Sequence, residues 1–192
     1  MLHTRERLES FYKYENGCYL IEMKYSNLKN IFNTIDPAPI LDKDLNDTAS
    51  EYIISSVQEI GIRQPVKIII YLPGKIDIRK WSKILTLAFN NFFEYKSQNE
   101  KQKLRFMFKD GRISFVIGIF FLVFCIIAGN FVPEYDIGAL GNLLKEGLLI
   151  GGWVAMWKPV QLLLYDWWPI LRTYRINKKL AATPVEIRKT KT

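Results

Sequence analysis

Lys158 and Asp166 are the ionisable residues whose setting most needs an explanation. Both lie in the otherwise apolar stretch 147–167. A lysine at the centre of a membrane-spanning helix costs about 2.5–3.5 kcal/mol on insertion scales, so other groups should offset this cost. Lys158 could line a polar cavity or pair with an acidic group of a partner. Alternatively, its side chain reaches the membrane interface beside a helix kink at Pro159, which also frees the Ala155 carbonyl from its usual hydrogen bond.

The other reactive side chains form no recognised catalytic or metal-binding pattern. His3 is the only histidine, which leaves no Ser-His-Asp or Cys-His arrangement. Cys18 and Cys125 form no metal or redox motif at their spacing. We therefore predict no catalytic residues, no metal site and no cofactor, and we expect a non-enzymatic protein. Five acidic residues cluster near the start of a predicted helix, where the helix dipole favours acids. Their spacing does not match a calcium-binding loop. They are Asp36, Asp42, Asp44, Asp47 and Glu51.

Two apolar stretches are long enough to cross a bilayer. Residues 113–132 carry no charge. At about 1.5 Å per residue they extend roughly 30 Å, the thickness of a hydrocarbon core. Residues 147–168 are less regular because they contain Lys158. This second stretch either crosses fully, or stops near Lys158 and continues as an interfacial helix. Tyr165, Trp167 and Trp168 resemble an aromatic belt at a membrane boundary, which favours a full crossing.

The charges around these stretches predict their orientation. Basic residues precede the first stretch and follow the second, whereas the loop 133–146 is mainly acidic. Positive flanks stay in the cytosol, so we predict a transmembrane hairpin with both chain ends cytosolic. The N-terminal residues do not resemble a secretory signal peptide. The net charge of +8 fits anionic lipid headgroups rather than nucleic acid as the partner. The predicted interface anchors are Arg112, Tyr165, Trp167, Trp168, Arg172 and Arg175.

Gly147, Gly151 and Gly152 predict close helix packing in the second stretch. Small residues spaced four apart let two helices approach closely. The packing partner is either the first stretch, at Gly118, Ala128 and Gly129, or a second copy of the chain. We expect a homo-oligomer or a partner membrane subunit.

The first 93 residues have the pattern of a small α/β domain. Strands are predicted at 17–25 and 65–72, with a short helix at 27–33, a helix from about Leu45 to Ile60 capped by Asp42 or Asp44, and a helix from Asp77. The two strands are expected to be parallel neighbours. The predicted fold is thus a membrane protein with a small cytosolic α/β domain (β-α-α-β-α) and a two-helix transmembrane hairpin. Its parts are the cytosolic domain 1–93, a charged helical stalk 94–112, transmembrane helices 113–132 and 147–168 around an external loop 133–146, and a basic cytosolic tail 169–192.

The string EGLLIGGWVAMWKPVQLLLYDWWPI at 146–170, with PVEI at 184–187, resembles a pattern that recurs in small bacterial proteins with two transmembrane helices. This resemblance implies a bacterial inner-membrane protein and no particular activity. The shorter string WVAMWKPV at 153–160 loosely resembles the Trp–Pro–Val pore motif of calcium uniporters. That motif needs acidic side chains at the pore mouth, and Lys158 precedes the proline here, so calcium conduction does not carry over.

We expect a non-enzymatic anchor or accessory subunit that presents its cytosolic domain at the membrane. The alternative is a homo-oligomeric channel or transporter component in which Lys158 faces a polar cavity.

Overall fold

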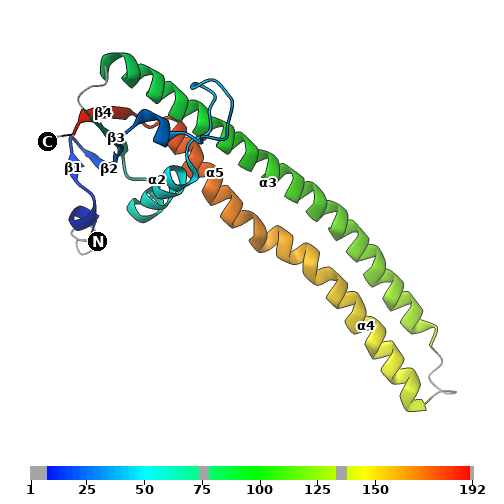
Figure 1. The fold of residues 1–192 in the computed structure, drawn as a ribbon. Helices are drawn as coiled ribbons and strands as arrows, with labels where there is room; N and C mark the ends of the chain where they lie inside the picture. Colours follow the sequence, from blue (N-terminus) through cyan, green and yellow to red (C-terminus); the bar gives the residue numbers. More distant parts are fainter. Residues whose placement is uncertain (1–7, 74–77, 133–137, 191–192) are drawn as a thin grey trace. The chain divides into compact units, whose positions relative to one another are not determined.

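The chain folds into two compact units. The computed structural model describes residues 8–73, 78–132 and 138–190 (Figure 1). One unit combines Met1–Asn99 with Arg172–Thr192, and the other comprises Glu100–Leu171. Helix α3 (Ile78–Asn130) runs through the boundary between them.

A four-stranded mixed sheet forms the centre of the first unit. Its strands are β1 (Tyr14–Glu15), β2 (Cys18–Lys24), β3 (Val66–Leu72) and β4 (Val185–Lys189), and they lie in the order β1-β2-β3-β4. β1 and β2 form an antiparallel hairpin. Its turn residues Asn16 and Gly17 have φ values of 51° and 81°, as a type I′ turn requires. β2 pairs with β3, and β3 with β4, in parallel (Figure 1).

Short local signals set the boundaries of the two helices between β2 and β3. The 3₁₀-helix η1 (Leu28–Ile31) begins after Asn27, whose side chain accepts a hydrogen bond from the Lys29 amide. Helix α2 (Asp47–Ile60) is capped by Asn46, whose side chain accepts from the Thr48 amide, rather than by the predicted Asp42 or Asp44. α2 ends at Gly61, where φ is 100°. The predicted β2, β3 and α2 therefore exist with small shifts at their ends.

The core of this unit lies on one face of the sheet. Alternate residues of the strands point to this face, as the two-residue repeat of a strand requires. The buried apolar residues of α2, of the first part of α3 and of α5 (Trp167–Ala181) belong to the same cluster. Representative fully buried members are Ile21, Ile68 and Ile70 from the strands and Ile53, Phe89 and Ile176 from the helices.

The C-terminal segment differs from the predicted organisation. Residues 169–192 were expected to form a basic tail. Instead, α5 from Arg172 onward and β4 belong to the α/β unit, and β4 adds a parallel strand beside β3. The predicted β-α-α-β-α order was therefore incomplete, because it lacked β1 and β4. The apolar residues Val185 and Ile187 alternate with charged ones, and this places them on the core face.

The second unit is a pair of long helices. α3 is helical without a break through Gly111. Helix α4 (Gly138–Gln161) is followed directly by the π-helix η2 (Leu162–Asp166) and by α5. Part of the predicted loop 133–146 is α4, and residues 133–137 lie outside the described part of the chain. By length and composition, two helical stretches in the described residues could cross a membrane, Trp81–Asn130 and Ala139–Ala181. Only 17% and 11% of their most apolar windows are buried within the described residues.

Replacing a buried residue of β4 tests whether the strand is part of the domain. Ile187 is 6% exposed, and an Ile→Ala change at such a site typically costs about 2–5 kcal/mol. We expect Ile187→Ala to speed hydrogen exchange of the β3 amides, measured by mass spectrometry on the full chain in detergent. The exposed Lys189→Ala change in the same strand is the control. Equal exchange in the two variants would contradict the assignment of β4 to the core.

Candidate functional site

Lys158 and Asp166 form an ion pair across a short π-helical segment. Their Nζ and Oδ2 atoms are 3.8 Å apart, and Gln161 Nε2 donates a hydrogen bond to the other carboxylate oxygen at 3.4 Å. Eight residues of regular α-helix would leave the two side chains roughly 80° apart around the axis. A π-helical turn is wider and rotates less per residue, which brings Asp166 back toward the face of Lys158. Their side chains are 68% and 32% exposed, so the pair is open to its surroundings.

Pro159 lies inside α4, three residues before the π-helix begins. Proline has no backbone N–H, and its ring crowds the carbonyl four residues earlier, so the regular hydrogen-bond pattern is interrupted here. The indole nitrogen of Trp167 donates to the carbonyl of Leu163 at 3.1 Å, inside the π-helical turn. Single π-helical turns are rare and are frequently found at functional sites. The sequence predicted a kink at Pro159 but not this π-helix.

Close contacts between α3 and α4 depend on glycine. A Cβ atom on Gly118 would lie 2.8 Å from Met156 Sδ. On Gly152, a Cβ would lie 2.8 Å from Leu122 Cδ1 and 3.3 Å from Cys125 Cβ. The two distances of 2.8 Å are too short for a real Cβ atom unless the neighbouring side chains move. At Gly118 the near atom ends a flexible side chain, but at Gly152 Cys125 Cβ and Leu122 Cα (3.4 Å) are also close, so Gly152 limits how closely the helices approach.

Gly147 and Gly151 lie in a different environment from Gly152. No heavy atom lies within 4 Å of a Cβ built on either of them. Along the helix, Gly147, Gly151, Val154 and Lys158 are spaced four, three and four residues apart, so they share one face. Beside them, Ile150, Trp153 and Trp157 contribute to a shallow groove of about 610 Å³ that also includes Val154 and Lys158. The role of Gly147 and Gly151 in packing stays a prediction, and it would require a group outside the described residues.

Aromatic side chains cluster where α4 gives way to α5. Trp167 and Trp168 stack with ring centroids 4.7 Å apart, and Phe108 of α3 lies 6.3 Å from the Trp167 ring. Tyr165 is exposed. The three predicted arginine anchors, Arg112, Arg172 and Arg175, are also exposed. The anchor role of these residues stays a prediction.

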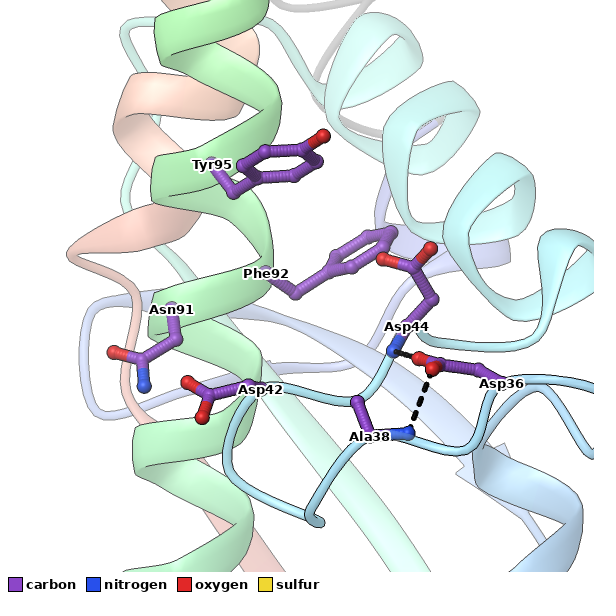
Figure 2. A pocket seen from close by; sticks show the side chains of 7 residues that line it. All are labelled: Asp36, Ala38, Asp42, Asp44, Asn91, Phe92 and Tyr95. Carbon is purple, nitrogen blue, oxygen red and sulfur yellow. Dashed lines mark hydrogen bonds between the residues drawn. The ribbon is translucent and has the colours of Figure 1, made fainter.

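Three of the predicted acidic residues, Asp36, Asp42 and Asp44, border a separate pocket of about 340 Å³, which Asp47 and Glu51 do not line (Figure 2). The Asp36 carboxylate accepts hydrogen bonds from the backbone amides of Asp44 (2.7 Å) and Ala38 (2.9 Å). These two bonds lower the pKa of Asp36. Its carboxylate thus organises the loop instead of pointing freely into the pocket. In the described residues, no three His, Cys, Asp or Glu side chains are grouped so that they could hold a metal ion. The remaining lining residues are Asn91, Phe92 and Tyr95.

A network of paired charges covers the other face of the sheet. Glu22 of β2 accepts a hydrogen bond from the Tyr71 hydroxyl of β3 at 2.6 Å and pairs with Lys13 at 2.9 Å. Burial alone would raise the pKa of Glu22, but the hydrogen bonds from Tyr71 and Lys13 outweigh burial and lower it. The same bond raises the pKa of Tyr71. This pairing ties β2 to β3 through side chains as well as through the backbone.

Arg188 extends this network to both edge strands. Its guanidinium donates to Glu186 at 2.8 Å and to Glu15 of β1 at 2.9 Å. Glu186 also pairs with Lys67 of β3. The hydrogen bonds to Glu186 and Glu15 raise the pKa of Arg188. Sequence reasoning missed these residues, because their partners are distant in the chain. Since each charge is matched, the network acts as a structural clamp across the sheet.

Comparison with known proteins yields no match to a family model, to a curated protein or to a solved structure.

The contrast between neighbouring glycines gives a direct test of helix packing. Gly152→Val should push Leu122 and Cys125 away from α4 and destabilise the helix pair by about 1–3 kcal/mol, the usual range for overpacking. Gly151→Val carries the same loss of helical freedom but places its methyl groups in open space. The measurement is unfolding in mixed micelles with increasing dodecyl sulfate, followed by circular dichroism. Equal destabilisation by the two changes would contradict the packing described above.

Proposed function

We propose that this protein is an integral protein of the bacterial inner membrane whose two-helix hairpin anchors a small cytosolic α/β domain, and that it serves as a non-enzymatic anchor or accessory subunit. The observation that supports the proposal is that β3 pairs with β4, although the two long apolar helices separate these strands in the sequence.

The apolar surface of these helices supports insertion into lipid. Large apolar side chains along both helices are more than half exposed, including Phe120, Phe124, Trp153 and Trp157. Soluble monomers rarely expose continuous apolar surface of this extent. A bilayer would cover these side chains, and α-helices satisfy their own backbone hydrogen bonds there.

Strand pairing supports two crossings instead of one. β3 precedes the helical pair and β4 follows it, yet Ile68 and Val185 are register partners in one sheet. A single crossing would place these strands on opposite sides of the membrane, where they could not pair. α4 alone has 24 residues, about 36 Å at 1.5 Å per residue, which is enough for a crossing. This constraint is independent of the charge pattern, which favours the cytosol for the α/β domain.

Cysteine labelling tests both insertion and orientation. In a background with Cys18→Ser and Cys125→Ala, Asn142→Cys should react with an impermeant maleimide in intact spheroplasts. Lys189→Cys should react only after lysis, because β4 lies in the cytosolic domain. The protein should also remain in the membrane after extraction with alkaline carbonate. Release by carbonate would contradict insertion, and the reverse labelling pattern would contradict the orientation.

The outward face of α4 favours a second candidate function, a homo-oligomeric channel or transporter component. The supporting observation is that no described atom lies within 4 Å of a Cβ added to Gly147 or Gly151. They share a face with Lys158, whose side chain is 68% exposed although it pairs with Asp166. A charge facing lipid is costly, whereas a charge facing a second copy or a polar path is not.

Ion flux distinguishes this candidate from the anchor. In liposomes that contain the purified protein, Lys158→Ala should change the ratio of anion to cation flux, and Lys158→Arg should preserve that ratio because it retains the charge. The mass of the protein in mild detergent gives its oligomeric state in the same preparation. A monomer without flux would contradict the channel and leave the anchor.

A further inference from the structure

We propose that a basic stripe on α3, formed by Lys101, Arg105, Lys109 and Arg112, binds the headgroup of an anionic phospholipid in the cytosolic leaflet, with Lys109 and Arg112 at its phosphate. This inference rests on the proposed membrane insertion and adds a defined lipid site to it.

The stripe is a single face of one helix. Its four residues are spaced four, four and three apart, so at 3.6 residues per turn they fall within an arc of about 80°. All four side chains are exposed. None of the four has an ion-pair partner within the described ranges 8–73, 78–132 and 138–190. Their positive charge is therefore not neutralised by the protein.

Acidic residues nearby lie on other faces of the helix. Asp110 is about 140° from the centre of the arc. Glu100 is already paired with Lys103 at 2.6 Å. On α3 itself, the stripe therefore concentrates positive charge without a carboxylate on the same face.

A groove of about 630 Å³ runs along this face, and it contains apolar as well as basic side chains. Leu104 and Phe108 lie between the cations, and Ile113 begins the uncharged run at the end of the groove. Phe108 also contacts Trp167, an aromatic of the kind found at membrane boundaries. Basic and apolar side chains thus line the same groove, and its last residue, Ile113, begins the uncharged run directly after Arg112.

This sequence of groups favours a lipid over a nucleic acid. A lipid whose acyl chains lie along residues 113–132 would hold its phosphate beside Arg112 and Lys109, with Arg105 one to two turns further from the hydrocarbon. Each cation near an anionic membrane surface contributes about 1 kcal/mol, which is roughly fivefold in affinity. A single-stranded nucleic acid would instead need exposed aromatic faces for base stacking, and Phe108 is half-buried in contact with Trp167.

The test measures retention of phosphatidylglycerol by the full chain in detergent, using native mass spectrometry. The stripe variant carries Lys101→Gln, Arg105→Gln, Lys109→Gln and Arg112→Gln. The control variant removes the same charge at four exposed residues of the α/β unit, Lys24→Gln, Lys29→Gln, Arg63→Gln and Lys83→Gln. We expect the stripe variant to bind phosphatidylglycerol at least about tenfold more weakly than the wild type, with no change in the control. Phosphatidylcholine should bind the wild type weakly. A double variant, Arg105→Gln with Lys109→Gln, keeps the test valid should the fourfold variant fold poorly.

Several outcomes would overturn the proposal. An equal loss in both fourfold variants would assign the binding to net charge. Equal retention of phosphatidylcholine would remove the role of the anionic headgroup. Displacement of the lipid by micromolar glycerol phosphate, or by an RNA oligonucleotide, would assign the stripe to a soluble phosphate or to nucleic acid. If the stripe variant binds phosphatidylglycerol as well as the wild type does, and the wild type resists carbonate extraction, only this inference is refuted. Release of the wild type by carbonate would refute the proposed membrane insertion as well.

Discussion

The parallel pairing of β3 with β4 is the constraint on which the rest of the structure depends. It joins two segments separated by 112 residues, from Pro73 to Pro184 (184 − 73 + 1). The cost of closing such a loop grows only slowly with its length, and here most of the connection is helix. The pairing gives β3 a neighbour on each side and completes the apolar face against which α2, α3 and α5 pack. It also requires that any crossings of a membrane between the two strands be even in number.

Local patterns were sufficient to predict β2, α2 and β3. Each has a continuous apolar or helical repeat and a clear boundary residue, such as Gly61 after α2. β4 was missed because it has only five residues and its partner strand lies far away in the chain. β1 has only two residues, although the Asn16-Gly17 turn beside it was a readable hairpin signal.

The features of the candidate site also differ in whether local sequence patterns predict them. The position of Pro159 in a helix and the presence of small residues could be read from the sequence. The direction that each glycine faces could not be read from the sequence, because Gly151 and Gly152 are neighbours and differ only in what surrounds them. The charge network on the sheet joins Glu22 to Tyr71 and Arg188 to Glu15 across long sequence separations. Such pairs depend on strand order, which no local pattern specifies.

The position of β4 in the chain also orders the steps by which the domain is made. At about 5–20 residues per second, a ribosome needs on the order of 6–20 seconds to synthesise the segment between β3 and β4. During that interval the Ile-rich β3 has an unpaired edge, and unpaired apolar edges are where chains aggregate. The sheet therefore reaches its final form only after both long helices have been translated. A nascent chain delayed in its hairpin displays that edge to the chaperones and proteases of the cell for as long as the delay lasts.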